Sequence, residues 1–202
     1  WRQVITLSLT PPVRQYSAIA SLEESKDVIM FGGRARTCYQ DFRDTWMFKQ
    51  SISDWIKLSP ESSPPARCGH AMASIGKSNN VVLFGGLYGG SDSSTKSLQD
   101  TWIFRQSISD WIALSPESSP PACYGHAMAS LGDIPKVVLF GGSDGPQTLQ
   151  DTWIFDSITT DWTQIIVLNS PPARLRHAMA SMGNTAVMYG GKDNYNAYLD
   201  DT

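Results

Sequence analysis

The stretch Pro64-Pro-Ala-Arg-Cys-Gly-His-Ala-Met-Ala-Ser74 is followed by Val81-Val-Leu-Phe-Gly-Gly86, by Asp100-Thr-Trp-Ile-Phe104 and by Asp110-Trp111. The same text occurs before and after it, so the chain is an array of internal repeats. The double proline begins at Pro11, Pro64, Pro120 and Pro171, which are 53, 56 and 51 residues apart. A period of about 50 residues with a Gly-Gly doublet and two spaced tryptophans is typical of propeller blades and not of helical solenoids.

The repeat resembles the kelch-repeat family over essentially all 202 residues. The resemblance implies an all-β, kelch-type β-propeller of four-stranded antiparallel blades. The resemblance indicates little about function, because proteins with this fold have many unrelated functions. Some kelch-like propellers are enzymes, including copper oxidases and sugar isomerases, but no residue set of theirs can be carried over to this chain.

Each unit contains four expected strands. The first alternates larger and small residues, as in His70 to Ser74, which suits the crowded inner strand beside the axis. The second is a short apolar run such as Val81 to Phe84, which is typical of a strand buried on both faces. It ends at Gly-Gly, because glycine tolerates positive φ and lets the neighbouring blade approach closely.

A loop of variable length follows the glycines, then Asp-Thr-Trp-x-Phe forms the third strand and Asp-Trp opens the fourth. The sequence therefore predicts these divisions: the last strand of a preceding blade (1–10), three whole blades (11–63, 64–119 and 120–170) and an incomplete blade (171–202). We expect the chain to be part of a longer propeller of roughly five to eight blades. A complete four-bladed ring, or two copies that complete each other, is the alternative.

Composition excludes few functions. The net charge of −3 offers no basic footprint for a nucleic acid. No apolar run is long enough to span a membrane, and no signal peptide is visible. The three cysteines lie at non-equivalent repeat positions, which predicts neither disulfides nor a metal site, and we expect a reducing, cytoplasmic location.

Alternate turns of an up-and-down blade lie at opposite ends, so the Pro-Pro turns and the Gly-Gly loops share one face. This face carries nearly all the variation between units, and variable loops on a rigid scaffold commonly serve recognition. In kelch-like proteins it is also the usual partner-binding surface, which only the resemblance implies. The sequence thus predicts a protein or peptide partner there.

Two columns of equivalent positions change between units while the scaffold stays fixed: Tyr16, Gly69, Gly125 and Arg176, and next to them Gln15, Cys68, Tyr124 and Leu175. Arg176 and Tyr16 are the first candidates for contact, because their column enters the inner strand at the channel mouth. The remaining candidates come from the second column and the adjacent loops: Tyr124, Tyr88, Asp92, Asp144, Asn194 and Tyr195. For each of them a solvated loop residue without a role is the alternative.

Other repeated residues are assigned to the scaffold. His70, His126 and His177 share one position, and we expect hydrogen bonds across strands in place of metal binding, because equivalent atoms of different blades lie too far apart for one ion. Each Asp before Thr-Trp is expected to cap a turn. Arg14, Arg67 and Arg174 are expected to bind backbone carbonyls or a carboxylate in the next blade.

The favoured function is therefore a non-enzymatic interaction module or adaptor that needs no cofactor and no metal. Two alternatives stay open. The chain could belong to an enzyme or a carbohydrate-binding propeller whose site lies in blades outside it, or it could be a structural component of a large assembly.

Overall fold

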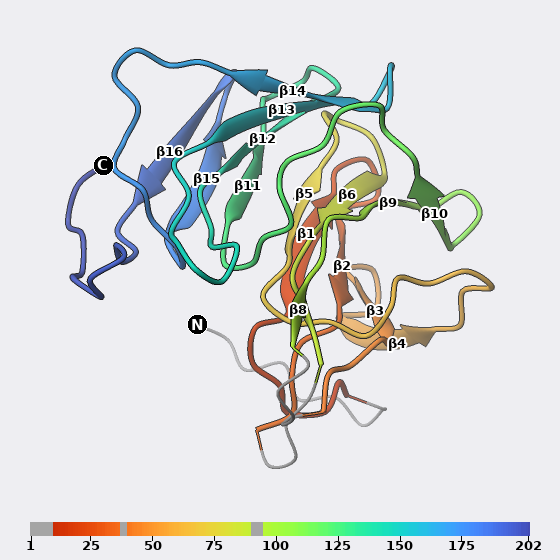
Figure 1. The fold of residues 1–202 in the computed structure, drawn as a ribbon. Helices are drawn as coiled ribbons and strands as arrows, with labels where there is room; N and C mark the ends of the chain where they lie inside the picture. Colours follow the sequence, from red (N-terminus) through yellow and green to blue (C-terminus); the bar gives the residue numbers. More distant parts are fainter. Residues whose placement is uncertain (1–9, 37–39, 90–94) are drawn as a thin grey trace.

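The computed structural model describes residues 10–36, 40–89 and 95–202, and these residues form strands and turns without a helix. Three four-stranded antiparallel sheets and a two-stranded sheet follow each other along the chain, and a further two-stranded hairpin lies in one loop (Figure 1). In each four-stranded sheet the strands pair in sequence order. The predicted all-β class and the four-stranded antiparallel units are confirmed. The strand expected in Trp1 to Leu7 lies outside the described residues.

Each sheet is called a blade here. Blade 1 consists of β1 (Ala18–Leu22), β2 (Asp27–Phe31), β3 (Thr45–Lys49) and β4 (Asp54–Leu58). Blade 2 consists of β5 (Ala71–Ser74), β6 (Asn80–Phe84), β9 (Thr101–Arg105) and β10 (Asp110–Leu114). Blade 3 consists of β11 (Ala127–Ser130), β12 (Lys136–Phe140), β13 (Thr152–Asp156) and β14 (Asp161–Ile165). Blade 4 is the pair β15 (Ala178–Met182) and β16 (Thr185–Tyr189).

The Gly-Gly loop of blade 2 differs from the irregular loop that its sequence predicts. It contains a short hairpin, β7 (Leu87–Tyr88) paired with β8 (Lys96–Ser97). Residues 90–94 between these strands lie outside the described part of the chain.

The inner strands β1, β5, β11 and β15 lie side by side around a common axis (Figure 1). Their small residues, such as Ala73 and Ala129, are buried between neighbouring blades. The second strands of blades 1 to 3 are largely buried as expected, and in β6 the residues from Val81 to Phe84 have no exposed surface. For β16 the expectation was wrong: Val187 and Tyr189 are 36% and 57% exposed, since blade 3 is the only described sheet that packs against blade 4. The blades thus stand radially, each covering the face of the next.

The apolar core therefore lies between blades. One cluster joins Leu22, Ile29 and Phe31 of blade 1 to Leu83 and Trp111 of blade 2, and a second joins blade 2 to blade 3 in the same way. Trp111 packs edge-on against Phe31 of the preceding blade at 5.2 Å between ring centroids. Its indole N–H donates to Thr45 Oγ1 of that blade at 3.0 Å.

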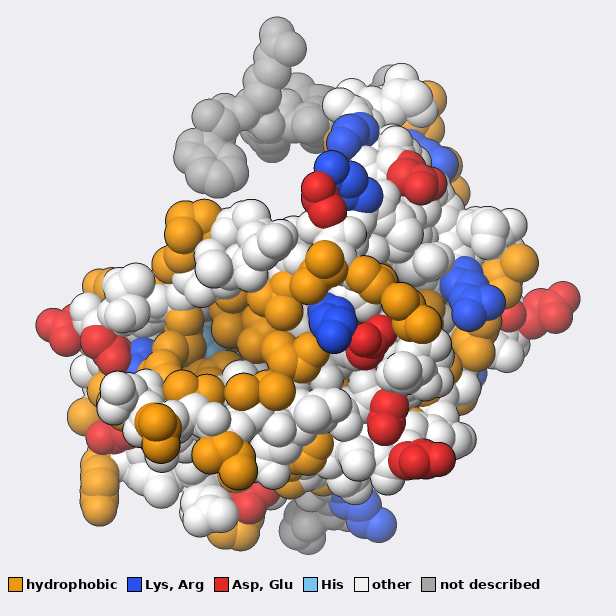
Figure 2. Space-filling view, turned by 90° about the horizontal axis from the view of Figure 1, so that it is seen from above, with side chains coloured by type: hydrophobic (Ala, Val, Ile, Leu, Met, Phe, Trp, Pro, Cys, Tyr) orange, Lys and Arg blue, Asp and Glu red, His pale blue; other side chains and the backbone are white. Residues whose placement is uncertain are grey.

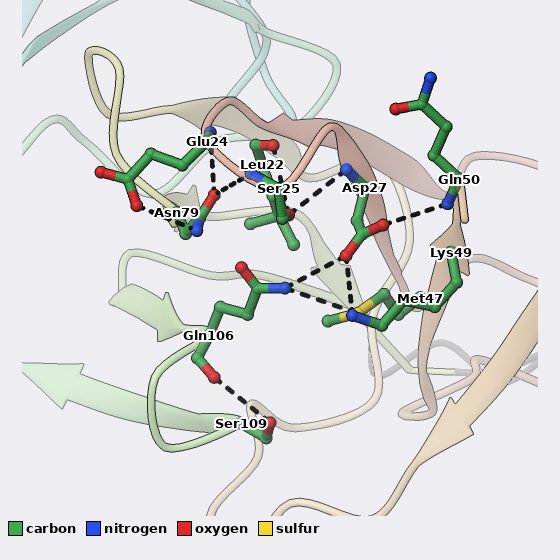
Figure 3. Close-up of polar contacts among 10 residues, drawn as sticks. All are labelled: Leu22, Glu24, Ser25, Asp27, Met47, Lys49, Gln50, Asn79, Gln106 and Ser109. Carbon is green, nitrogen blue, oxygen red and sulfur yellow. Dashed lines mark hydrogen bonds and ion pairs between the residues drawn. The ribbon is translucent and has the colours of Figure 1, made fainter. Parts of the chain in front are cut away.

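The contact between blades 2 and 3 repeats this arrangement. Trp162 meets Phe84 at 5.2 Å and donates to Thr101 Oγ1 at 3.0 Å. Polar contacts also join blades 1 and 2 at the turns between β1 and β2, β5 and β6, and β9 and β10, as Figure 3 shows. The Asp27 carboxylate accepts from Lys49 of its own blade and from Gln106 of the next, and Asn79 of blade 2 accepts from the Glu24 and Ser25 backbone N–H groups.

Candidate interaction face

The Pro-Pro turns and the Gly-Gly loops lie together at one end of the blades. In every unit a residue just after the prolines forms an antiparallel bridge to the residue after the glycines. The bridges are Gln15 to Arg34, Cys68 to Leu87, Tyr124 to Ser143, and Leu175 to Lys192. We call the surface formed by these loops the loop face.

Glycine is required at both positions of the doublet, as predicted. Gly85 and Gly86 have φ of 61° and 102°, in the left-handed region that side chains rarely adopt. A Cβ on Gly85 would lie 2.6 Å from the Cys123 carbonyl oxygen of the next blade, and one on Gly86 would lie 2.9 Å from His70 Cβ. The doublet thus allows adjacent blades to meet and makes room for the repeated histidine.

The three histidines are buried and pack edge-on against phenylalanines of the preceding blade. The expected side-chain hydrogen bonds across strands are absent at His70 and His177, whose ring nitrogens have no partner of ordinary geometry among the described residues. His126 Nδ1 lies 3.4 Å from Cys123 Sγ. Burial lowers the pKa of His126 to about 3 and that of His177 to about 4, so all three rings are neutral at pH 7.

The described residues contain no group of three potential ligands that could hold a metal ion. They also contain no helix that could cross a membrane.

The repeated arginines hold the carboxylates before Thr-Trp. Arg67 Nη1 and Nη2 donate to both oxygens of Asp100 at 2.7 and 2.6 Å, and further bonds reach the Gly85 and Pro65 carbonyls. The expected bonds from the arginine to backbone carbonyls are confirmed, whereas two other expectations were wrong. The carboxylate belongs to the same blade as the arginine, and the aspartate accepts from the guanidinium and the Trp102 indole instead of capping a turn.

At the channel mouth a chain of backbone hydrogen bonds links the four units of the first variable column. Gly69 N–H donates to the Tyr16 carbonyl, Gly125 N–H to Gly69, and Arg176 N–H to Gly125, at 2.7 to 2.9 Å. All four residues have φ between 58° and 67°. Tyr16 and Arg176 therefore have the left-handed backbone conformation for which the equivalent residue of units 2 and 3 is a glycine.

The side chains of these two residues meet, although 160 positions separate them. The Arg176 guanidinium carbon lies 5.4 Å from the centre of the Tyr16 ring, within cation–π range, and both residues are exposed. The structure thus brings together the first two candidates from opposite ends of the chain.

The other candidates are spread over the surrounding loops. Tyr88 and Tyr195 are exposed, by 50% and 90%, and Tyr124 is half-buried. Two side chains are engaged in loop structure: Asp144 Oδ1 accepts from the Gln147 N–H, and Asn194 Oδ1 accepts from Thr148 of the preceding blade. Asp92 lies outside the described residues.

Sequence reasoning missed a third variable column, the residues directly after the glycines. Arg34, Leu87, Ser143 and Lys192 differ in every unit and bridge to the second column. Arg34 forms an ion pair with Asp41 and donates to the Gly89 carbonyl of the next blade at 2.7 Å. The same comparison of equivalent positions would have found this column.

A pocket of about 470 Å³ lies between the inner strands. Its walls come from equivalent Ala and Ser residues of all four units, with methionines in units 2 to 4 and Ile19 in unit 1. Charged residues also line it, namely Glu23 and the ion pair of Lys77 and Asp133. The view from above in Figure 2 shows a hollow with apolar side chains around its rim. The inner-strand part of this wall repeats from unit to unit, so only the charged residues at the turns distinguish one side of the pocket from another.

Comparison with known proteins gives consistent matches. The family model described as KLHDC2/KLHL20/DRC7 Kelch-repeats domain matches residues 87–202, more than half of the chain. The chain is 28% identical to Tip elongation aberrant protein 1 of Schizosaccharomyces pombe over 99% of its length, and 27% identical to Adagio protein 3 of Arabidopsis thaliana over 96%. It is 26% identical to human Kelch domain-containing protein 10 over 83%. The aligned part spans only 18%, 31% and 38% of these three relatives.

Proposed function

Because the chain belongs to the kelch-repeat family, whose members generally serve as protein-interaction modules, we propose that it is a non-enzymatic module that binds a protein segment on the loop face. The proposed contact centre is the pair Tyr16 and Arg176. Tyr88, Tyr124 and Tyr195 on the neighbouring loops are proposed to widen the contact, with Asp92, Asp144 and Asn194 beside them.

The observation that carries this proposal is the backbone conformation at the channel mouth. A residue other than glycine in the left-handed region costs about 1 kcal/mol or more. Units 2 and 3 avoid the cost with Gly69 and Gly125, whereas units 1 and 4 retain Tyr16 and Arg176 at φ of 58° and 59°. Strain of this kind is common at functional sites, and Tyr and Arg are the side chains enriched in binding hot spots.

The chemistry of the loop face also favours binding over catalysis. Kelch-repeat proteins are generally non-enzymatic. The side chains that repeat between units are engaged in the scaffold, the arginines with carboxylates and the histidines with aromatic rings. What differs between units is the set of exposed loop residues, and a peptide can use such residues without any reaction.

A peptide-display selection tests the proposal and requires no identified partner. Peptides selected on the unmodified chain are expected to lose about tenfold or more in affinity when Tyr16→Gly or Arg176→Gly is introduced, because a hot-spot side chain contributes about 2 kcal/mol or more. Both variants replace a residue of positive φ by glycine, so the fold is expected to keep or gain stability.

Ser109→Gly is the matched control. Ser109 also has a positive φ of 52°, but it lies in the β9–β10 turn at the opposite end of the blade. This variant is expected to bind the selected peptides as the unmodified chain does. Peptides that bind all three variants equally would refute the proposed contact centre.

A further inference from the structure

The arginine after Pro-Pro shows how this scaffold binds a guanidinium group. Arg67 donates to three kinds of acceptor in its own blade: the Pro65 carbonyl, the Gly85 carbonyl and the Asp100 carboxylate. Arg14 and Arg174 repeat the full set with the corresponding proline, glycine and aspartate. Three units thus place the same acceptors around the same planar cation.

Blade 3 has the acceptors without the arginine. Cys123 stands at the arginine position, while Pro121, Gly141 and Asp151 occupy the positions of the three acceptors. No hydrogen bond or ion pair joins the Asp151 side chain to another described residue. This carboxylate is therefore the one member of its column, among the described residues, that lacks a guanidinium partner.

A second observation comes from the neighbouring tryptophan. The Trp46 and Trp102 indole N–H groups each donate to the aspartate of their blade at 2.6 Å. In blade 3 the equivalent Trp153 Nε1 is buried and has no acceptor among the described residues. In blades 1 and 2 the carboxylate accepts from the arginine and from the indole N–H at the same time. In blade 3, where the arginine is missing, the Asp151 carboxylate and the Trp153 indole N–H both lack these bonds within the described residues.

Asp151 can be reached from outside. It lines a pocket of about 630 Å³ together with Gln150, Gln164 and the segment 165–168. That segment is Ile-Ile-Val-Leu, with Ile166 and Leu168 more than 90% exposed. The pocket thus places a carboxylate without a partner opposite an aliphatic wall.

Burial raises the pKa of the Cys123 thiol to about 12, so the thiol is neutral at pH 7. Where blades 1, 2 and 4 have an arginine paired with an aspartate, blade 3 therefore has only the negative charge of Asp151. A planar cation complements it with charge-assisted, bidentate hydrogen bonds.

We propose that the Asp151 carboxylate, where it lines this pocket, is a binding site for the guanidinium group of a partner's arginine side chain. The aliphatic wall at 165–168 contacts apolar residues beside that arginine. This site is separate from Tyr16 and Arg176, so it can hold even if the contact centre proposed above is wrong.

The indole N–H resonance of Trp153 reports on this site. In ¹⁵N-labelled protein, with the peak assigned by Trp153→Phe, methylguanidinium is expected to shift it with half-saturation in roughly the low millimolar range, well within the limit for so small a ligand. The peak moves because the bound cation draws the carboxylate back over the indole. Methylammonium, which cannot form the bidentate pair, is expected to bind at least about tenfold more weakly.

Three variants decide the assignment. Cys123→Arg supplies the guanidinium from the chain itself, so the Trp153 peak is expected near those of Trp46 and Trp102 and no longer responds to methylguanidinium. Asp151→Asn removes the carboxylate and the response, and Cys123→Ser retains the response. A shift that persists in Asp151→Asn, or no shift in the unmodified protein, overturns the proposal even if Cys123→Arg does not fold.

A pair of peptides identifies the source of the group. Acetyl-Leu-Arg-Leu-amide is expected to bind more tightly than methylguanidinium, because its leucines add apolar contact with the segment 165–168. The same peptide with citrulline, which has the shape of arginine without its charge, is expected not to bind. Equal affinity of the arginine peptide and methylguanidinium would contradict the role of the aliphatic wall.

Discussion

At the scale of single residues, the arginine after Pro-Pro holds several parts of a blade together. The Arg67 side chain is fully buried with its charge, and Asp100 and two carbonyls satisfy its donors. Burial acts to raise the pKa of Asp100, but the bonds from Arg67 and Trp102 outweigh it, and the pKa lies below its ordinary value. One side chain thus joins the entering linker, the glycine turn and the third strand of a blade.

Arg67→Met is expected to lower the free energy of unfolding by about 3–5 kcal/mol, because it leaves a carboxylate without its buried partner. Arg67→Met with Asp100→Asn is expected to recover part of this loss, since the asparagine is neutral and still accepts from Trp102. Urea denaturation monitored by circular dichroism measures both. Arg105→Met, at an exposed arginine, should change stability by no more than about 0.5 kcal/mol. A similar small effect at Arg67 would disprove this view of the pair.

At the scale of elements, the fourth strand of one blade is bound to the third strand of the preceding blade. Trp162 of β14 is buried and donates to Thr101 of β9, and Trp111 of β10 does the same to Thr45 of β3. A tryptophan on the fourth strand therefore needs a hydroxyl on its neighbour, which explains why the sequence repeats Asp-Thr-Trp together with Asp-Trp.

Thr101→Val keeps the shape of the side chain but leaves the buried indole N–H of Trp162 without an acceptor. We expect a loss of about 1–3 kcal/mol in the free energy of unfolding, measured in urea. Thr152→Val is the matched control, because no hydrogen bond is formed by the Thr152 side chain within the described residues. If the two variants lose equal stability, the bond between blades contributes nothing specific.

At the scale of the whole molecule, each blade is stable only through its neighbours, because the apolar clusters lie between sheets. The three histidines lie in these junctions. Their low pKa is therefore a property of the assembled blades, and the unfolded chain has the ordinary value near 6.5.

Stability is expected to fall as the pH drops from about 6.5 to 4. In this range the unfolded chain binds protons on its histidines while the folded chain does not, so acid favours unfolding. Each such histidine contributes up to about 1.4 kcal/mol per pH unit. The aspartates of the arginine pairs, whose pKa values are lowered in the folded state, lose their contribution only at still lower pH. Urea midpoints measured between pH 7.5 and 4.5 test this range.

His126→Ser isolates one of the three contributions. Serine occupies the equivalent position in unit 1, at Ser17, so the scaffold accepts it. The variant is expected to lose about a third of the pH dependence above pH 4.5, whatever its stability at pH 7. An unchanged slope would show that the histidines do not govern acid unfolding.

The local pattern predicted the strands, the glycine doublets and the common end of the variable loops, because side-chain period and chain reversal depend on neighbouring residues. It could not predict the partners of the repeated polar residues. The carboxylate that binds Arg67 belongs to Asp100, 33 residues further along the same blade, whereas the sequence analysis expected a carboxylate of the next blade. Steric fit between strands, which no local pattern encodes, decides such pairings.

The sequence by itself thus determined a tandem array of four-stranded β units with fixed scaffold columns and variable loop columns, since repetition alone reveals both. Only the tertiary structure decided that Tyr16 meets Arg176 and that Cys123 leaves Asp151 and Trp153 unpaired among the described residues. The reason is that ring geometry and buried hydrogen bonds depend on how blades pack around an axis. Segments from distant parts of the chain meet there at atomic distances.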